Sequence, residues 1–322
     1  MKIGQLYNLE AFQGFVDSGK KAGFKDAYSG TVLSRNLEAI DPTIFEKKYP
    51  ELAFVNSGIV ADNTGGFVEQ IRSLRVRPTG QFKVAGDESS NKGKISMAGE
   101  TSFIRVMQKE AESQWTETQV RQAEMQNINL PSQFVKYHNE IYLREVDEIG
   151  FLGVEEYGTK GLLNYTGFDS DSATGVITGL TAEQMYDDIA DAIITQWNAV
   201  NNTTEYKANR VVFPTYVMNE LTRKIMNTAN GSNITVFRML QANFPEIVFS
   251  STFRADDAGG AGVSHTVIYN NNSEAMKMRI PEALTIGEVV KLTSFKHLVE
   301  SRYRIAGLDV LEDTAGFILT GF

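Results

Sequence analysis

The sequence predicts an α+β fold in which one long hairpin lies outside the packed domains. Polar and apolar residues alternate with period two between residues 67 and 108, on both sides of a polar segment, which is typical of a β-hairpin. Residues 131–149 carry apolar side chains on more than one helical face, and the second half alternates helices with short strands. A chain of 322 residues has room for two such folding units.

Composition narrows the class of protein. No apolar stretch approaches the roughly 18 residues that span a bilayer, and residues 1–20 lack the apolar run of a secretory signal, so we expect a soluble chain without membrane contact. Cysteine is absent, and the only histidines are His138, His265 and His297. These counts exclude disulfides, thiolate nucleophiles and iron–sulfur clusters. We therefore expect neither a metal nor a cofactor.

The N-terminal segment should not fold by itself. Residues 1–35 have scattered glycines and no sustained period, which indicates an arm that lies on another surface. The next segment should contain one short helix, beginning at Asp41-Pro42 and ending at Tyr49-Pro50, followed by an extended run.

The hairpin comes next. We expect its strands at residues 67–77, 82–84, 94–97 and 103–106, with turns at Pro78-Thr79-Gly80 and in the polar run that follows. Eleven residues at about 3.3 Å each reach about 36 Å. A two-stranded ribbon is only marginally stable in water, so this one should lie against its own domain or a neighbour.

Two helices follow the hairpin. Thr116 and Gln119 have the spacing of a capping box, which predicts a short helix to about Gln126. Pro131 then opens a longer helix that we expect Gly150 to close. Because its apolar residues occupy more than one face, we expect this spine helix, about 28 Å long, to be covered on two sides.

The second half of the sequence predicts a mixed sheet with flanking helices. Residues 292–322 again have the pattern of strands and turns. The individual expectations are a helix capped by Thr181 and Gln184 that ends near Trp197, a strand at 210–213, a helix from Thr215, a helix capped by Asn233 that ends at Gln241, and strands at 247–249 and 266–269.

Catalytic signatures are absent: the chain has no G-x-S-x-G, Walker or H-E-x-x-H motif. Asp169, Asp171 and Gly175 depart from the spacing of a calcium loop, which favours a solvated turn. His138 could be a general base, but no nucleophile accompanies it, which favours a helix-surface or interface histidine.

The carboxylates of the spine helix allow two interpretations. Glu145, Asp147 and Glu148 could form an acid pair, but in an acidic helix they are more simply a solvated or partner-facing edge. We favour the second interpretation.

The charges are unevenly distributed. Residues 72–94 hold six basic and two acidic side chains, whereas residues 110–156 hold three basic and ten acidic ones. Complementary charges on separate elements would orient a self-associating protein, although a charged hairpin edge could also serve to prevent aggregation. The residues that we predict at a subunit interface are Arg72, Arg75, Arg77, Lys83, Lys92, Lys94, Glu145 and Glu148.

The order of these parts resembles the major capsid proteins of tailed bacteriophages, which have the Hong Kong 97 capsid fold shared with encapsulins. At residue level the resemblance is carried by residues 67–85, by residues 131–150 with Gly161-Leu162-Leu163-Asn164, and by residues 302–321. It implies an N-terminal arm at 1–35, a peripheral domain at 36–60 and 101–175 that contains the spine helix at 131–149, an extended loop at 61–100 that lies over the adjacent subunit, an axial domain at 176–291, and return strands to the peripheral domain at 292–322.

The resemblance implies a structural protein and not an enzyme. Copies would assemble in the host bacterial cytoplasm into hexamers and pentamers of an icosahedral phage head around double-stranded DNA, with portal, scaffolding and decoration proteins as partners. A net charge of −9 suits a shell whose lining does not hold DNA, so we expect no sequence-specific DNA contact. Two alternatives stay open: an encapsulin-like compartment and a cytosolic α/β enzyme with an unrecognised site.

Two details of the family bear on assembly. Some members cross-link a lysine of the extended loop to an asparagine near the chain's end, but residues 293–322 contain no asparagine, so we do not expect that cross-link here. Some members also carry a long scaffolding segment at the N-terminus. Because there is no room for one before residue 35, we expect a separate scaffold or a processed form.

Overall fold

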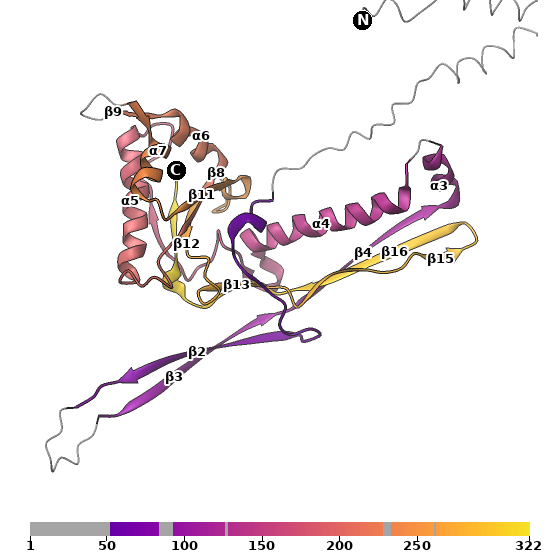
Figure 1. Ribbon diagram of the computed structural model, residues 1–322, viewed down its shortest axis with the longest axis horizontal. Helices are drawn as coiled ribbons and strands as arrows, with labels where there is room; N and C mark the ends of the chain where they lie inside the picture. The colour runs from indigo at the N-terminus through magenta and orange to yellow at the C-terminus, as the bar shows by residue number, and fades with distance from the viewer. Residues whose placement is uncertain (1–51, 84–92, 126–127, 228–232, 261) are drawn as a thin grey trace, which may run out of the picture.

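The computed structural model describes residues 52–83, 93–125, 128–227, 233–260 and 262–322. They form an elongated body along one long helix, a second body around a five-stranded sheet, and a hairpin that projects from between the two (Figure 1). This mixture of helices and strands confirms the predicted α+β class. The predicted arm at 1–35 and the helix expected near Asp41 lie outside the described residues.

The hairpin consists of strands β2 (Gln70–Gly80) and β3 (Ile95–Arg105), which pair antiparallel over all eleven residues. The expected long ribbon is therefore confirmed, but the turn expected at Pro78-Thr79-Gly80 is wrong, because these residues continue β2 opposite Met97, Ser96 and Ile95. The outer edges of a two-stranded ribbon are open, so a proline there can lack its ladder hydrogen bond. Residues 82 and 83, expected in a strand, lie outside both strands.

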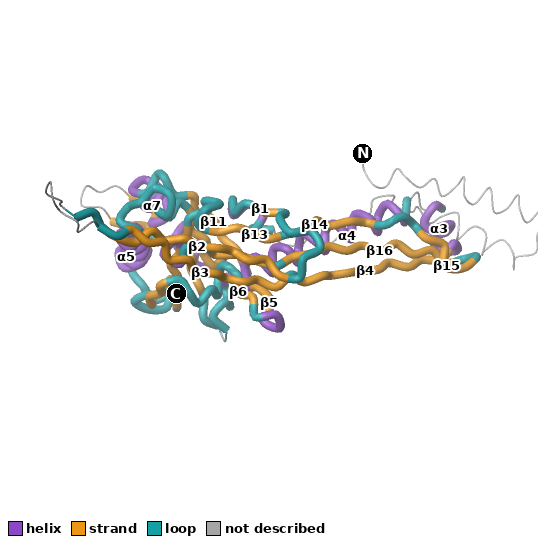
Figure 2. The backbone as a smooth tube through the Cα atoms, turned by 90° about the horizontal axis from the view of Figure 1, so that it is seen from below, coloured by secondary structure: helices purple, strands orange, loops and turns teal. Residues whose placement is uncertain are grey.

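The elongated body is a sheet with a helix along it. Strand β4 (Met107–Thr116) runs in line with β3 and pairs over ten residues with β16 (Lys296–Ile305), which also pairs with β14 (Glu282–Ile286) and β15 (Val290–Thr293). Helix α4 (Leu130–Leu152), the predicted spine helix, lies along this sheet (Figure 2). Sequence reasoning missed β4.

Both helices of this body begin where their caps predict. Helix α3 (Glu117–Glu124) has the complete capping box of Thr116 and Gln119. At the other end of α4 the prediction is wrong, because the helix runs past Gly150 to Leu152 and ends at Gly153, whose φ is 73°. Gly150 serves a different purpose: a Cβ there would lie 2.5 Å from the ring of Phe54, so the glycine permits close packing.

Coverage of α4 is uneven along its length. The C-terminal part is buried at Val146, Asp147 and Ile149, whereas Val135 and Ile141 are 42% and 51% exposed. Among the described residues the sheet covers one side of the helix, and the expected second cover does not extend over Val135 and Ile141.

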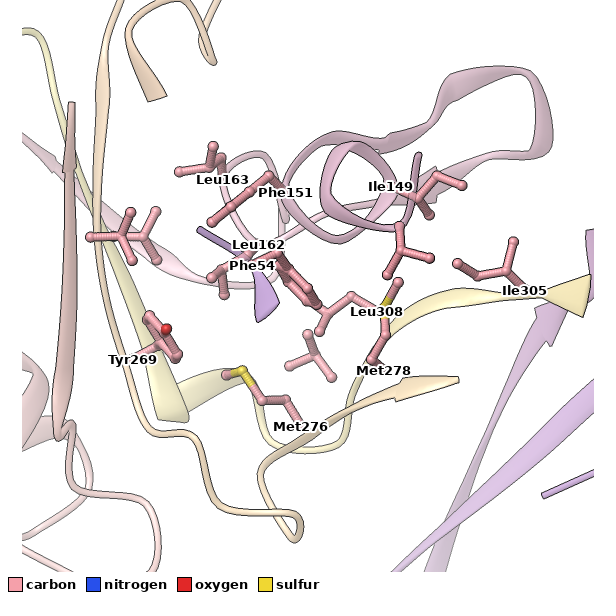
Figure 3. Close-up of a cluster of buried hydrophobic side chains, with 14 of the residues drawn as sticks. Phe54, Ile149, Phe151, Leu162, Leu163, Tyr269, Met276, Met278, Ile305 and Leu308 are labelled. Atoms are coloured by element: carbon pink, nitrogen blue, oxygen red, sulfur yellow. The ribbon is translucent and has the colours of Figure 1, made fainter. Parts of the chain in front are cut away.

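The end of α4 is joined to the core by the turn Gly161-Leu162-Leu163-Asn164. The amides of Leu162 and Leu163 donate to the carbonyls of Gly150 and Phe151, both at 2.9 Å, and the Asn164 side-chain amide donates to Leu152 at 2.8 Å. Strands β5 (Gly153–Val154) and β6 (Thr159–Lys160) flank η3 (Glu155–Tyr157). Both leucines are fully buried in the cluster shown in Figure 3.

A small sheet connects this core to the rest of the chain. Strand β13 (Met276–Arg279) lies between β1 (Ala61–Asp62) and β17 (Gly307–Val310), parallel to the first and antiparallel to the second. Three short 3-10 helices complete the connections: η2 (Val55–Ser57), η4 (Phe253–Ala255) and η5 (Asp313–Ala315). Met276 and Met278 of β13 point into the buried cluster (Figure 3).

The second body is a mixed sheet with helices. The strand order is β11 (Val248–Thr252), β8 (Arg210–Pro214), β12 (His265–Tyr269), β18 (Gly316–Thr320) and β7 (Asp169–Ser172). Its helices are α5 (Ala182–Ala199), α6 (Thr215–Arg223) and α7 (Val236–Asn243). The capping box that starts α5 is confirmed. None of the helices in the described ranges is long and apolar enough to cross a membrane.

Two details of this body differ from expectation. Asn233 does not cap a helix: it begins β10 (Asn233–Thr235), which pairs with β9 (Ile225–Asn227), and Thr235 caps α7 instead. The final strand β18 lies inside the five-stranded sheet, whereas β16 returns to the elongated body. The domain limits themselves stay a prediction.

Candidate subunit interface

The two faces of the hairpin differ in chemistry. Directly paired residues of an antiparallel ribbon point to the same side. Here one side carries most of the large apolar residues of the ribbon, and its polar residues, apart from Thr101, lie at the inner end: Gln70, Arg72 and Arg105. Its large apolar side chains are between 47% and 77% exposed: Leu74, Val76, Ile95, Met97 and Phe103. We call these five residues the apolar face. A contiguous exposed surface of this kind marks an interaction site, whereas single exposed apolar residues are ordinary.

The opposite face of the hairpin is held by its own chain. Arg75 donates a hydrogen bond to the carbonyl of Val310 and lies 3.6 Å from Asp313, and Arg77 lies 3.6 Å from Glu312. Both arginines therefore fix the inner half of the ribbon to the segment that follows β17. They have intrachain partners, which the prediction of an interface did not anticipate.

A buried ion network holds the base of the hairpin. The Arg279 guanidinium donates to Asp309 at 2.9 and 3.0 Å, to the Ser73 hydroxyl at 3.2 Å, and to Asp62. Ser73 in turn donates to Asp309 at 2.6 Å. Asp309 is 2% exposed and Arg279 is 8% exposed. Hydrogen bonds from Thr64, with help from Arg279, lower the pKa of Asp62, which favours its charged form.

The remaining predicted interface residues of the hairpin lie apart from this network. Arg72 is on the same side as the apolar face, donates to Thr101 at 3.3 Å and has its guanidinium 5.9 Å from the centre of the Phe103 ring. Lys83 and Lys94 are exposed at the outer end of the ribbon. Lys92 lies outside the described residues.

The predicted acidic residues of α4 are engaged within the chain. Glu145 accepts from Lys109 at 3.2 Å and from the Tyr303 hydroxyl. Glu148 lies 3.4 Å from Arg254. The seven predicted interface residues that the structure describes thus lie in several separate places, and contact with a neighbour stays a prediction for all eight.

Asp147 corrects the interpretation of this helix as an acidic edge. Its side chain is fully buried, accepts from the Phe54 amide at 2.8 Å and pairs with Arg254 at 2.6 Å. A solvated or partner-facing position is therefore wrong for Asp147. The carboxylate instead ties the end of α4 to two other segments.

His138 is inside the protein, between α4 and the sheet. Its Nδ1 lies 2.6 Å from the hydroxyl of Ser301 on β16, and its Nε2 lies 2.8 Å from that of Ser113 on β4. Ser301 also donates to the carbonyl of Ala111 at 3.4 Å. A surface position for this histidine is wrong. Burial lowers the pKa of His138, because the protonated imidazolium would lose its hydration.

Acid should weaken the docking of α4 through this histidine. His138 lines a cavity between α4 and β4. The other charged and titratable residues that line it are Lys109, Glu110, Glu112, Tyr137, Tyr142, Glu145 and Tyr303. An unfolded histidine takes up its proton near pH 6.5, but the buried one resists it. Below that pH the unfolded state binds more protons, so the free energy of unfolding should fall as pH falls to the folded pKa. Urea titrations between about pH 7.5 and about pH 5 should show that the unchanged protein loses more free energy of unfolding than the His138→Gln variant. If the free energies of the two proteins fall in parallel with pH, this account is wrong.

The other histidines have different neighbours. His265 contacts the carbonyl of Leu163, and His297 stacks on Trp115 with ring centres 6.3 Å apart. The described residues contain no group of three or more histidine, aspartate or glutamate side chains that could hold a metal ion. Asp169 and Asp171 lie on the exposed strand β7.

Comparison with known proteins gives a family match. Residues 80–321 match the family model described as "Major capsid protein". The capsid of Myoviridae phage XM1 has 42% sequence identity to this chain and a TM-score of 0.79, covering 90% of this chain and 98% of that one. No curated protein matches this chain.

More distant structures share the fold. The capsid of an empty GTA particle is 10% identical with a TM-score of 0.64, over 92% of this chain and 99% of that one. A chain of Microbacterium phage Oxtober96 is 10% identical with a TM-score of 0.65, over 92% and 100%. These matches confirm the capsid fold that the sequence resembles.

Proposed function

The chain belongs to the major capsid protein family, and on that premise we propose that its copies form the hexamers and pentamers of an icosahedral phage head around double-stranded DNA. One observation supports the proposal most strongly: the ribbon β2–β3 projects from the subunit (Figure 1), and the large side chains of its apolar face are exposed. A monomer gains nothing from exposing this surface to water, whereas a neighbour that covers it gains about 25 cal/mol for each Å² of apolar area buried.

The anchoring of the opposite face supports the same proposal. Arg75 and Arg77 hold the ribbon to residues 310–313, so its direction is set before a neighbour arrives. An element that is already oriented loses less conformational entropy on association. In this proposal the elongated body and the ribbon make contacts between subunits, and the second body lies around the hexamer and pentamer axes.

The negative net charge of the chain is consistent with a shell that encloses DNA and does not bind it. A net charge of −9 opposes the attraction that fixes phosphates to a protein surface. We therefore propose that packaged DNA makes no sequence-specific contact with this protein. Assembly in the host cytoplasm with a scaffold and a portal protein completes the proposal.

Electron microscopy of the purified protein tests the proposal. We expect shells, tubes or free hexamers and pentamers when the full chain is produced alone or with a scaffolding protein. The matched control is the same preparation at a salt and denaturant concentration that dissociates it, examined by sedimentation. A protein that stays monomeric under all assembly conditions would contradict a shell function. Closed shells that contain foreign protein cargo would favour an encapsulin-like compartment.

We propose that the assembled protein has no catalytic activity. The sequence has no catalytic motif, and both ring nitrogens of the buried His138 are engaged by the hydroxyls of Ser113 and Ser301. His138→Gln, His265→Gln and His297→Gln should alter stability or assembly only. Screens of the assembled protein against ester, phosphate and glycoside substrates should find no turnover. A turnover that one of these substitutions abolishes would show that an enzyme site exists.

A further inference from the structure

An arginine of the second body holds the C-terminal part of helix α4. The Arg254 side chain, 10% exposed, donates from Nε to Asp147 at 2.6 Å and from an Nη atom to the carbonyl of Arg144 at 3.3 Å, and its guanidinium lies 3.4 Å from Glu148. The carbonyl end of a helix carries partial negative charge, and α4 has no basic residue in its last turn. Arg254 therefore supplies the positive charge that this end of α4 lacks.

Arg254 is itself held firmly within the second body. It lies on η4, which follows directly after β11, and β11 pairs with β8 over five residues. The next residue, Ala255, is fully buried, and Asp256 accepts a hydrogen bond at 2.9 Å from the amide of Thr215, the first residue of α6. Because its neighbours on both sides are held by the sheet and by α6, Arg254 presents its guanidinium to α4 from a fixed place.

The same part of α4 also contacts the second body through apolar side chains. Val146 and Ile149 belong to the buried cluster that contains Val267 and Tyr269 of the second body. Apolar packing is non-directional, whereas a guanidinium and a carboxylate bond in a fixed planar geometry. The cluster fixes where α4 ends, and a contact of defined geometry is needed to fix its angle.

A small change in this angle has a large effect at the far end of the helix. Figure 1 shows α4 extending away from the second body. The stretch from Leu130 to Asp147 is about 26 Å long, so a tilt of about 10° moves Leu130 by about 4.5 Å. The sheet of the elongated body follows this movement, because His138 of α4 lies 2.6 Å from the hydroxyl of Ser301 on β16.

We propose that Arg254 is the positioning residue that sets the angle between the elongated body and the second body. Asp147 is its main partner, since the pair is buried and joins residues 107 positions apart in the chain. The proposal rests on the proposed function in one respect: where both bodies contact neighbours, the angle between them in each subunit determines the curvature of the shell. Loss of the pair should therefore give subunits with a variable angle and shells of variable diameter.

Spin labels on two cysteines measure the angle in unassembled subunits, because the natural chain contains no cysteine. Val135→Cys on α4 and Ile194→Cys on α5 are suitable positions, since the two side chains are 42% and 43% exposed. The protein with only these two changes should give one narrow distance distribution. Adding Arg254→Met should shift the mean or widen the distribution by about 4 Å, the movement that a tilt of about 10° causes. An unchanged distribution would overturn the proposal.

Further variants identify the ion pair as the cause. Asp147→Asn keeps an oxygen that can accept from the Phe54 amide but loses the charge, so it should change the distribution as Arg254→Met does. If Arg254→Met does not fold with Asp147 left unpaired, the double variant with Asp147→Asn removes both charges, and its distribution decides. The matched control is Arg223→Met, because this exposed arginine pairs with Glu220 on the same helix. An equally large change in Arg223→Met would also overturn the proposal.

Electron microscopy of assembled shells tests the effect on curvature. Arg254→Met shells should vary in diameter, whereas Leu240→Ala, which truncates a fully buried side chain inside the second body, should lower stability and keep the original diameter. Arg254→Met shells of one unchanged diameter would overturn the link to curvature. If the unmodified protein forms no shells under any condition, the proposed function fails, and the spin-label distances still decide whether Arg254 sets the angle.

Discussion

Removal of the outer hairpin should abolish shell assembly and leave the subunit folded. The change is a deletion of residues 78–93, which leaves residues 94–97 as a connection between Arg77 and its strand partner Ala98. A connection of about four residues is a common hairpin loop. The described residues that are removed include no buried side chain, and the contacts of Ser73, Arg75 and Arg77 remain.

The expected loss is large because the contact is repeated in every subunit. Each large apolar side chain that a neighbour covers contributes on the order of 1.5–3 kcal/mol. The deletion takes away the strand partners of Ile95 and Met97, so these two residues of the apolar face are no longer held in a strand. Sedimentation velocity should find the deleted protein as free subunits, with a circular dichroism spectrum and urea unfolding curve close to those of the full chain.

Two double variants test whether assembly requires the apolar face or only the presence of the ribbon. Thr79→Ala with Ser96→Ala changes a hydroxyl pair on the opposite side of the same strands, where the two oxygens lie 3.0 Å apart, and should assemble normally. Leu74→Ser with Met97→Ser should behave like the deletion. Normal shells from the deleted protein would remove the hairpin from the account of assembly.

The sequence was most informative where local patterns determine the structure. Alternation between residues 67 and 108 predicted the ribbon and its length, and the spacing of Thr116 with Gln119 and of Thr181 with Gln184 predicted two helix starts. These signals depend on neighbours in sequence. Strand β4 gave no such signal. Its outward positions include Glu110 and Glu112, and its residues form a strand because they pair with β16, which is far away in the sequence.

The candidate interface was only partly predictable, since charge alone does not identify a partner. Arg75 and Arg77 were recognised as a basic cluster, but their partners Asp313 and Glu312 lie more than two hundred positions away in the chain. The apolar face was within reach of sequence reasoning: once β2 and β3 are aligned from their turn, Leu74, Val76 and Met97 share one side. The burial of Asp147 was also within reach of sequence reasoning. Asp147 lies three and four residues before the buried Gly150 and Phe151, which places it on the same face of the helix.

The ion network at the base of the hairpin should dominate the stability of the subunit. Asp309→Ala leaves the Arg279 guanidinium, 8% exposed, without its main partner and takes away the acceptor of the Ser73 hydroxyl. Removing one member of a buried ion pair costs about 3–5 kcal/mol, and because Asp62 still pairs with Arg279 the loss should lie at the lower end of this range. We expect a loss of that size in the free energy of urea unfolding.

Two comparisons show whether burial is the cause. Arg121→Ala removes an exposed pair with Glu117, in which the arginine side chain is 72% exposed, and should cost less than about 0.5 kcal/mol. The double variant Arg279→Met with Asp309→Leu should be more stable than Asp309→Ala alone, since it replaces both buried charges by apolar groups. If Asp309→Ala instead costs no more than Arg121→Ala, burial does not set the cost, and water together with Asp62 must compensate the charge of Arg279.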